Sequence, residues 1–223
     1  MDGVIFDFNG TLFWDTKKHH DAWFELSRVV RGYPFSDEEF VKLTGHTNRS
    51  IMQYLSPGEL SEQKIHEMSM EKEKIYRELC RKDPDNLHLA PGAIDFLNYL
   101  RDNKVPRTIA SSSEITNIRF FIEVFKLEQW FDIDRIVYDQ GLFPGKPFPD
   151  IYLKAVEVLG LDASKCIVFE DAQAGIESAY KAKIGEIYCI NGDSKKDFAH
   201  LPGVTGVIND FNDFDRSIII TKH

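Results

Sequence analysis

The sequence predicts an α/β protein with a doubly wound parallel sheet and four further helices inserted after the first strand. Two observations lead to this fold class. Short apolar runs rich in β-branched residues recur along the 223-residue chain, and a helix-like pattern follows each run. Between about residues 15 and 82 this alternation stops, and only helical periodicity is present.

The expected strands are apolar on both faces, which is typical of parallel strands that helices cover from both sides. They lie at residues 4–8, 105–110, 166–169 and 186–190. Two of the helices between them are clearest, at residues 91–103 and 149–159. Each begins with a proline in its first turn and then repeats apolar residues at helical spacing.

The insert carries the signals of separate helices. Ser36 precedes three acidic residues, a pattern typical of an N-cap followed by an acidic first turn. A long charged helix follows, with an apolar stripe that includes Met68 and Ile75. We interpret its residues 71–74 as a solvated charged face.

Turn-forming residues suggest where the insert ends. The segment 83–92 contains Pro, Asn and Gly, and it returns the chain to the sheet. We therefore expect a core made of residues 1–14 and 86–223, and an inserted helical domain made of residues 15–85.

The composition narrows the classes of function. The formal net charge of −9 argues against nucleic acid or an anionic membrane as the main partner. No apolar stretch approaches the ~20 residues of a membrane span, and no basic segment precedes the N-terminal apolar run, as it would in a signal peptide. The three cysteines lie far apart without the spacing of a zinc site, as expected for free thiols in a reducing compartment. We therefore expect a cytoplasmic protein.

Polar residues stand where the first strand ends. Asp7 closes an otherwise apolar run, and Gly10 and Thr11 turn the chain sharply after it. Open α/β sheets place their ligands at this end of the strands, and the backbone N–H groups of such a turn can hold phosphate oxygens. A surface turn with a solvated aspartate would give the same pattern.

Two further loops carry groups that suit an anionic ligand. Ser111 and Ser112 follow the second strand at the start of a helix, where hydroxyls either clamp a phosphate or cap the helix. Lys146 lies between Gly145 and Pro147 in a stiff loop, although most lysines are solvated surface residues. Such a loop would fix the charge of the lysine against a phosphate or a carboxylate nucleophile.

A pair of carboxylates ends a third strand. Glu170 and Asp171 are adjacent there, and like charges in contact repel unless a cation compensates them. Mg²⁺ binds one or two carboxylates together with water and substrate phosphate, so it fits this pair best, although Asp171 could instead cap a helix. Parallel strands end at one edge of the sheet, so we expect this metal site to meet Asp7, Ser111 and Lys146 there. Together they would supply a nucleophile, a phosphate clamp and a charge neutraliser.

Four short motifs give the chain a family resemblance. In order and spacing, "DFNGTL", "ASSS", "GKPFPD" and "FEDAQAG" resemble the four motifs of the haloacid dehalogenase-like hydrolases. Within that family the chain is most similar to the β-phosphoglucomutase-like branch with a small helical cap. The resemblance covers nearly the whole chain, and it implies a Rossmann-like core with the inserted helices as a mobile cap over the site.

The resemblance also implies roles for the site residues. Asp7 would be the nucleophile that becomes an aspartyl-phosphate. Ser111 and Lys146 would bind the transferring phosphoryl group. Mg²⁺ would be held by three carboxylates and one backbone carbonyl, those of Asp7, Glu170, Asp171 and Asn9.

One position departs from the family pattern. In most phosphatases and mutases of the family the residue two after the nucleophile is a second Asp, which protonates the leaving oxygen and then activates water. Here it is Asn9. An amide can hydrogen-bond but cannot exchange a proton, and general acid–base catalysis is typically worth ~10²–10⁴-fold. Three explanations stay open: a phosphatase that is slow or uses leaving groups needing little protonation, a catalytically weak phospho-ligand binder, or an introduced substitution that traps a complex.

Residues of the insert would set specificity. His19 matches the histidine of the family pattern "HxxAW", here "HHDAW", and His20 would take its place after a shift of one residue. A histidine of the core or of the surface is the alternative. Arg49 resembles a substrate-phosphate-binding arginine of β-phosphoglucomutase, although its spacing from Gly45 is one residue longer. A solvated arginine at a helix end is the alternative.

The sequence thus predicts a Mg²⁺-dependent phosphatase that acts through an aspartyl-phosphate on a small phosphorylated metabolite, with a sugar phosphate as the first candidate by analogy. One alternative is a phosphosugar mutase, which would need proton transfer in both half-reactions. The other is a non-catalytic protein that binds a phosphorylated ligand. Small capped members of the family are often monomers, and we expect a monomer here.

Overall fold

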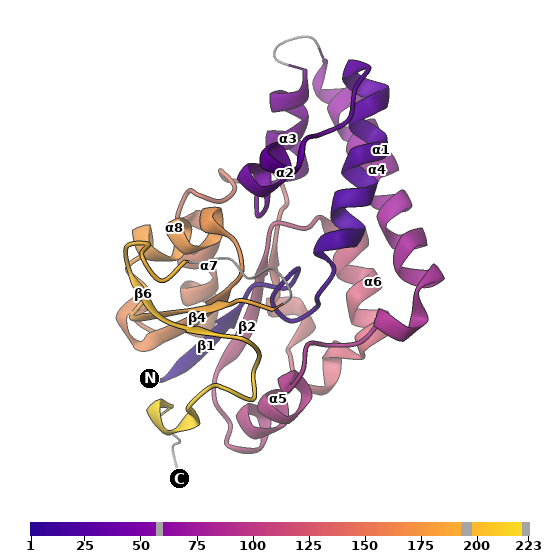
Figure 1. The fold of residues 1–223 in the computed structure, drawn as a ribbon. Helices are drawn as coiled ribbons and strands as arrows, with labels where there is room; N and C mark the ends of the chain where they lie inside the picture. Colours follow the sequence, from indigo (N-terminus) through magenta and orange to yellow (C-terminus); the bar gives the residue numbers. More distant parts are fainter. Residues whose placement is uncertain (57–59, 193–197, 220–223) are drawn as a thin grey trace.

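A computed structural model describes residues 1–56, 60–192 and 198–219 of the chain (Figure 1). The described strands form one parallel sheet in the order β3-β2-β1-β4-β5-β6. They are β1 (Gly3–Phe6), β2 (Arg107–Ser111), β3 (Val137–Tyr138), β4 (Cys166–Glu170), β5 (Glu186–Ile190) and β6 (Val204–Ile208). The predicted doubly wound α/β fold is confirmed, with β1 at the centre of the sheet.

The α-helices fall into two groups. Four stand together above the sheet in Figure 1, and we call them the cap: α1 (Thr16–Arg31), α2 (Asp37–Leu43), α3 (Asn48–Leu55) and α4 (Glu62–Lys82). The others cover the sheet: α5 (Ala93–Asp102), α6 (Ile115–Phe125), α7 (Asp150–Leu159) and α8 (Gln173–Lys181). Helices α5 and α6 pack on one face of the sheet, and α7 and α8 pack on the other.

Two strands on the edges of the sheet were not predicted from the sequence. β3 has only 2 residues, which is too short for a recognisable run. β6 alternates half-buried and exposed positions and contains Gly206, so it is not a continuous apolar run. The four predicted strands and the two clearest predicted helices are found, with ends that differ by at most one or two residues.

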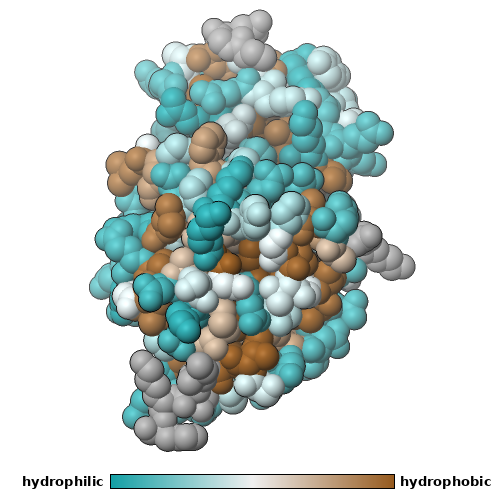
Figure 2. All heavy atoms as spheres, turned by 90° about the vertical axis from the view of Figure 1, so that its left-hand side faces the viewer, coloured by the Kyte–Doolittle hydropathy of each residue, from teal (hydrophilic) through white to brown (hydrophobic). Residues whose placement is uncertain are grey.

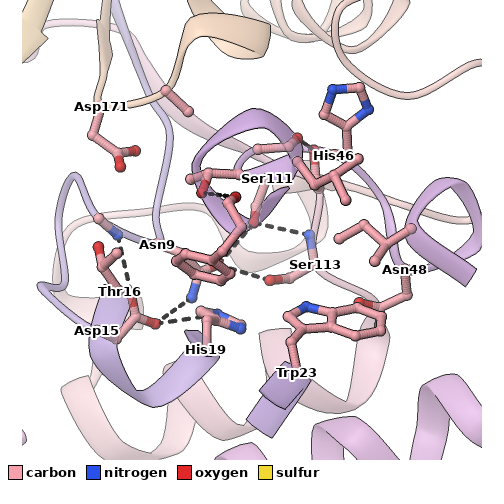
Figure 3. Close-up of a pocket in the computed structure, with 18 of the residues that line it drawn as sticks. Asn9, Asp15, Thr16, His19, Trp23, His46, Asn48, Ser111, Ser113 and Asp171 are labelled. Carbon is pink, nitrogen blue, oxygen red and sulfur yellow. Dashed lines mark hydrogen bonds and ion pairs between the residues drawn. The ribbon is translucent and has the colours of Figure 1, made fainter. Parts of the chain in front are cut away.

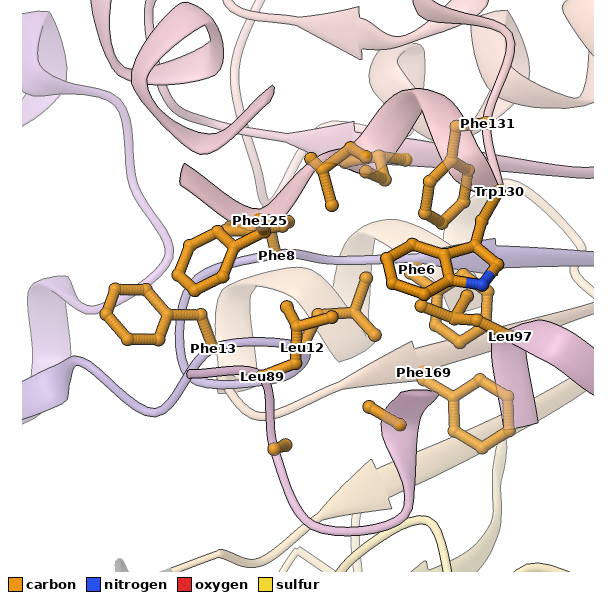
Figure 4. Packing of buried hydrophobic residues seen from close by; sticks show 14 of the residues in the cluster. Phe6, Phe8, Leu12, Phe13, Leu89, Leu97, Phe125, Trp130, Phe131 and Phe169 are labelled. Atoms are coloured by element: carbon orange, nitrogen blue, oxygen red, sulfur yellow. The ribbon is translucent and has the colours of Figure 1, made fainter. Parts of the chain in front are cut away.

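An aromatic cluster fills the space between the sheet and helices α5 and α6 (Figure 4). Phe6 stacks on Phe169 with ring centroids 5.4 Å apart, and Phe8 stacks on Phe121 at 4.3 Å. All four rings are fully buried. Because Phe6 and Phe8 flank Asp7 in the sequence, this packing holds the backbone of Asp7 in place at the end of β1.

The cap has an apolar cluster of its own, to which Trp23, Met52 and Ile65 contribute. The N-cap predicted for its second helix is present as a capping box. Ser36 Oγ accepts a hydrogen bond from the N–H of Glu39 at 3.1 Å, and the Glu39 carboxylate accepts one from the N–H of Ser36 at 2.9 Å. Such a cap typically contributes ~1 kcal/mol to helix stability.

The buried face of α4 differs from the predicted one. Met68 and Ile75 are only half-buried, whereas Lys72 and Glu73 are 1% and 2% exposed. The interpretation of residues 71–74 as a solvated face is therefore wrong for these two side chains. Helix α4 turns them inward because this face borders the pocket described below, where both find polar partners.

The surface on the left-hand side of Figure 1 mixes hydrophilic and hydrophobic residues (Figure 2). Large apolar side chains that stay exposed include Leu142 and Phe148, in the loop between β3 and α7. Scattered apolar groups are normal on folded surfaces. None of the described helices has both the length and the apolar composition that a membrane crossing requires.

Candidate active site

A pocket lies at the carboxyl edge of the sheet, beneath the cap (Figure 3). The loops after β1, β2 and β4 form its floor, and side chains from all four cap helices form its walls. The volume inside it that the centre of a water molecule can reach is about 80 Å³. The strand ends therefore converge on one site, as parallel strands should.

Lys146 is buried at the floor between two carboxylates. Its Nζ donates hydrogen bonds to Asp7 Oδ1 and to Glu170 Oε1, each at 2.6 Å, and its side chain is 1% exposed. Burial by itself would lower the pKa of Lys146, but the two carboxylates raise it above its ordinary value. The lysine is therefore a fixed positive charge that orients Asp7.

Both oxygens of Glu170 are engaged by the protein. Oε1 accepts hydrogen bonds from Lys146 and from the hydroxyl of Tyr152, each at 2.6 Å. Oε2 accepts from the backbone N–H groups of the next two residues, at 3.1 and 3.3 Å. A Cβ at Gly175 would lie 1.8 Å from Oε1, so a glycine at this position of α8 makes room for the carboxylate.

Three carboxylates cluster at the floor. One oxygen from each of Asp7, Glu170 and Asp171 lies within 4.8 Å of the others. Burial raises the pKa of Asp7 well above its ordinary value; Lys146 opposes this effect, and the charges of Glu170 and Asp171 add to it. A hard divalent cation such as Mg²⁺ prefers oxygen ligands and would relieve this repulsion, so the residues fit such an ion.

The turn after β1 supports Asp171. Thr11 is fully buried, and its hydroxyl donates to Asp171 Oδ1 at 3.3 Å. Gly10 has a φ of +80°, and a Cβ there would lie 2.1 Å from Asp171 Oδ2. The N–H of Gly10 donates to Asp15 Oδ1 at 3.0 Å. In this structure both residues therefore bind other parts of the floor, although the backbone of Gly10 borders the pocket.

The amide of Asn9 is locked in one orientation (Figure 3). Its Nδ2 donates to Asp15 Oδ2 at 2.6 Å and to the hydroxyl of Tyr76 at 3.3 Å. Its Oδ1 accepts a hydrogen bond from Ser113 Oγ at 2.7 Å. The hydroxyl of Tyr76 also donates to Asp15, and Asp15 is buried. The amide nitrogen of Asn9 therefore faces a buried carboxylate. A carboxyl group at position 9 would meet Asp15 directly.

Ser111 ends β2 and bonds to the floor, whereas the next residue, Ser112, bonds to the cap. Ser111 Oγ accepts from the N–H of Ser113 at 3.1 Å and donates to Asn9 Oδ1 at 3.5 Å. Ser112 Oγ donates to the backbone oxygen of Gly45 at 2.8 Å. Both serines line the pocket, and Ser112 also ties the cap to the core.

Of the two neighbouring histidines, His19 lines the pocket. Its ring stacks on Tyr76 with centroids 4.0 Å apart, and its Nε2 lies 3.4 Å from Asp15 Oδ2. His20 points elsewhere, with its ring nitrogens 3.2 Å from Asp21 and 3.3 Å from Asp37. The structure therefore distinguishes two positions that the sequence pattern left interchangeable.

Arg49 does not reach the pocket. Its Nη2 donates to Glu62 Oε1 at 2.7 Å, and its side chain is 56% exposed. The preceding residue, Asn48, lines the pocket instead and donates from Nδ2 to Glu73 Oε1 at 2.6 Å. This is the arrangement expected of a solvated helix-end arginine.

Several pocket residues were not singled out from the sequence. They come from the cap and from the loops around the floor, and they are Asp15, Thr16, Trp23, His46, Asn48, Lys72, Glu73 and Ser113. The motifs contained a signal for two of them, because Trp23 ends the "HHDAW" pattern and Ser113 belongs to the serine run. Asn48 and Glu73 had none, since they come from separate helices that only the fold brings together.

Comparison with protein families gives a match over most of the chain. A model described as haloacid dehalogenase-like hydrolase matches residues 1–183. This range contains every residue that lines the pocket and the whole cap.

Individual relatives point the same way. A "Phosphorylated carbohydrates phosphatase" of Thermotoga maritima is 28% identical over 198 residues, covering 84% of each chain. A "Beta-phosphoglucomutase" of Bacillus subtilis is 27% identical over 188 residues, covering 82% of this chain and 80% of the relative. Among solved structures, a HAD hydrolase of family IA, variant 3, from Entamoeba histolytica is 39% identical with a TM-score of 0.86, covering 97% of this chain and 96% of that one.

Proposed function

The chain belongs to the haloacid dehalogenase-like hydrolases, and from this membership we propose that it is a phosphatase acting through Asp7. The observation that carries the proposal is the position of Asp7 on the pocket floor, with Oδ1 held by Lys146 at 2.6 Å beside a cluster of carboxylates. The resemblance read from the four motifs is confirmed at the level of the family and its β-phosphoglucomutase-like relatives. The roles of individual residues are our proposal.

The proposed reaction has two halves. A carboxylate oxygen of Asp7 attacks phosphorus, the bond from phosphorus to the metabolite's oxygen breaks, and that oxygen takes up a proton from water as the alcohol leaves. Water then attacks the aspartyl-phosphate, which releases inorganic phosphate and restores Asp7. Lys146 and Ser111 would hold the charged oxygens of the phosphoryl group in both halves, so that catalysis is mostly positioning and charge neutralisation.

The predicted metal ligands are Asp7, Asp171, Glu170 and the backbone carbonyl of Asn9. Bound to them, Mg²⁺ would neutralise charge that develops on the transferring phosphoryl group. The carboxylate cluster and the raised pKa of Asp7 support a cation at this place.

The amide of Asn9 sets a limit on the rate. Its N–H groups already donate to Asp15 and Tyr76, and an amide cannot give up a proton to the leaving oxygen. We therefore expect slow turnover of ordinary alkyl phosphates and faster turnover of esters whose leaving group needs little protonation.

A sugar phosphate is the proposed type of substrate. The name of the Thermotoga relative and the mixture of polar and aromatic side chains that line the pocket support it. The cap helices would close over the substrate, and we propose that residues 15–85 form a cap domain on a core of residues 1–14 and 86–223. A monomeric state and a cytoplasmic location stay predictions.

A phosphosugar mutase is the second candidate, because a β-phosphoglucomutase is among the relatives. A mutase returns the phosphoryl group to a sugar hydroxyl and needs a proton transfer in each half-reaction. Asn9 cannot supply that transfer, so we rank hydrolysis first. A non-catalytic phosphate binder would bind metal and ligand without turnover. Product analysis separates all three, since free phosphate, an isomerised sugar or unchanged ligand would remain.

Removal of divalent cations provides a test of the proposed metal site. With a chelator present, phosphate release from a sugar phosphate or an aryl phosphate is expected to fall by about 10³-fold or more, since such charge stabilisation is worth several kcal/mol. Added Mg²⁺ should restore the activity. The measurement is the initial rate of phosphate release against Mg²⁺ concentration.

Two aspartates give a matched comparison for this experiment. Asp171→Asn should raise the Mg²⁺ concentration needed for half-maximal rate, because it removes one proposed ligand. Asp162→Asn makes the same chemical change at an exposed position after α7 and should leave that concentration unchanged. Undiminished activity in the chelator would contradict the proposed metal site.

A further inference from the structure

The cap wall of the pocket holds a buried ion pair that the proposed reaction does not use. Lys72 Nζ donates to Glu73 Oε1 at 2.9 Å, and the two side chains are 1% and 2% exposed. Oε1 also accepts from Asn48 Nδ2, and Oε2 accepts from Asn117 Nδ2, each at 2.6 Å. These contacts fix the Glu73 carboxylate in the pocket wall.

Glu73 is ionised at neutral pH. Burial by itself would raise the pKa of this carboxyl, but the charge of Lys72 and the hydrogen bonds from Lys72 and Asn48 lower it below its ordinary value. On the cap side a ligand therefore meets a carboxylate that already occupies the charge of Lys72, and at the floor it meets a cluster of carboxylates.

Lys72 cannot easily serve a ligand instead. Its Nζ also donates to His19 Nδ1 at 2.7 Å and lies 5.0 Å from the centroid of the Trp23 ring. To bind an anion it would have to leave Glu73, and a buried carboxylate without its partner is strongly destabilising. Lys72 is thus not available to bind a negatively charged ligand.

Apart from Lys72, no lysine is found among the described residues that line the pocket. Arginine is missing from the described residues that line the pocket, and Arg49 is exposed and paired with Glu62. Lys146 is paired with Asp7 and Glu170 at the floor. A phosphate can therefore be compensated at the floor but not beneath the cap.

We propose that Glu73 is a specificity-determining residue that restricts the enzyme to phosphate monoesters whose remaining part carries no second anionic group. The inference rests on the proposed phosphatase function and names its substrate class. A second phosphate against the cap wall would have to compete with Glu73 for Lys72, and like charges brought together at a binding interface cost several kcal/mol.

The rest of the cap wall suits an uncharged polyol. The apolar side chains of Trp23, Phe35 and Phe40 line the pocket beside polar Asn48 and Glu73. The C–H groups of a sugar can pack on such rings, while its hydroxyls can donate to a carboxylate. Sugar monophosphates should therefore be accepted, and the corresponding bisphosphates should be rejected.

The test compares matched ligands that differ by one phosphate. The probes are fructose 1-phosphate with fructose 1,6-bisphosphate, and glucose 6-phosphate with glucose 1,6-bisphosphate. Binding is measured by calorimetry on a protein carrying Asp7→Asn, which cannot transfer the phosphoryl group, and kcat/KM is measured on the protein with Asp7 intact. In both measurements the readout is the ratio of monophosphate to bisphosphate.

Two substitutions should shift this ratio, and one should not. Glu73→Gln removes the charge with little change in shape and leaves Lys72 available for an anion. Asn48→Arg replaces the amide that donates to Glu73 by a cation beside the same carboxylate, so it tests the same idea if Glu73→Gln fails to fold. Glu71→Gln is the matched control on the exposed side of α4.

The proposal expects the monophosphate of at least one pair to be preferred by about tenfold or more. Glu73→Gln and Asn48→Arg should each reduce this preference by about tenfold, while Glu71→Gln keeps it. Equal binding of the two ligands, or a preference that neither substitution alters, would overturn the role of Glu73 and leave the phosphatase function in place. If no substrate releases phosphate, the proposed function is wrong. The binding ratios would still decide whether Glu73 excludes a second phosphate.

Discussion

Phosphate release is expected to fall by about 10⁴-fold or more when Asp7 is replaced by asparagine, the scale of loss seen when a covalent nucleophile is removed. An amide oxygen is a poor nucleophile for phosphorus and cannot carry a stable phosphoryl group. The change also weakens the charge-assisted hydrogen bond from Lys146 Nζ to Asp7 Oδ1, which is 2.6 Å long. The measurement is the rate of phosphate release with Mg²⁺ from a panel of sugar phosphates and an activated aryl phosphate.

The loss should be a loss of chemistry and not of folding. Burial and two neighbouring carboxylates raise the pKa of Asp7, so removing its charge relieves repulsion at the floor even as it weakens the contact with Lys146. Denaturant unfolding should confirm that the variant is folded. Asp2→Asn, five residues earlier in the chain, should keep full activity as the control. An Asp7→Asn protein that retains most of its activity would exclude Asp7 as the nucleophile.

Replacing Asn9 by aspartate is expected to raise the rate on alkyl phosphates by about 10²-fold, the lower end of what general acid–base catalysis provides. The geometry favours a useful acid at this position. Asn9 Nδ2 lies 2.6 Å from Asp15 Oδ2, so a new carboxyl group would stand against a buried carboxylate. Two carboxyls in such contact hold a proton between them, which keeps one in the protonated form that a leaving oxygen needs.

The size of the gain should depend on the leaving group. An activated aryl phosphate leaves without protonation, so Asn9→Asp should accelerate it much less than a sugar phosphate. Asn48→Asp makes the same chemical change elsewhere in the pocket and should give no such gain. If the protein turns over sugar phosphates readily and Asn9→Asp changes little, then this site has another route for the proton.

The part of the site that lies on the sheet could be predicted from the sequence. Asp7 follows β1, Ser111 and Glu170 are the last residues of β2 and β4, and parallel strands necessarily end at one edge of the sheet. Local patterns therefore predict that these three side chains lie close together once the fold class is known. They also predict that Lys146 contacts the carboxylates of Asp7 and Glu170, each at 2.6 Å. The stacked rings of Phe6 and Phe8 that flank Asp7 belong to the same local pattern.

The cap side could not be predicted in the same way. Lys72 and Glu73 look like a solvated pair on a charged helix, and nothing nearby in the sequence shows that they are buried. Their burial depends on partners from other helices, such as Asn48 on α3 and Asn117 on α6. Helical periodicity marks apolar faces, so it misses a buried face made of polar residues.

The register of helix α3 explains why Asn48, and not Arg49, lines the pocket. Successive residues on an α-helix point about 100° apart, because one turn takes about 3.6 residues. A loop that is one residue longer than in the family pattern therefore directs Asn48 into the pocket and Arg49 towards Glu62. A resemblance based on residue type alone cannot resolve such a shift.

The phosphorylation state of Asp7 during turnover tests the central claim most directly. The protein is mixed with an activated aryl phosphate and Mg²⁺, quenched in acid, and the peptide containing Asp7 is analysed by mass spectrometry. Because Asn9 cannot activate water, we expect a phosphoryl group to accumulate on Asp7, to be absent from Asp7→Asn and to be less abundant in Asn9→Asp. Steady phosphate release with no phosphoryl group on Asp7, or with one on another residue, would contradict the account.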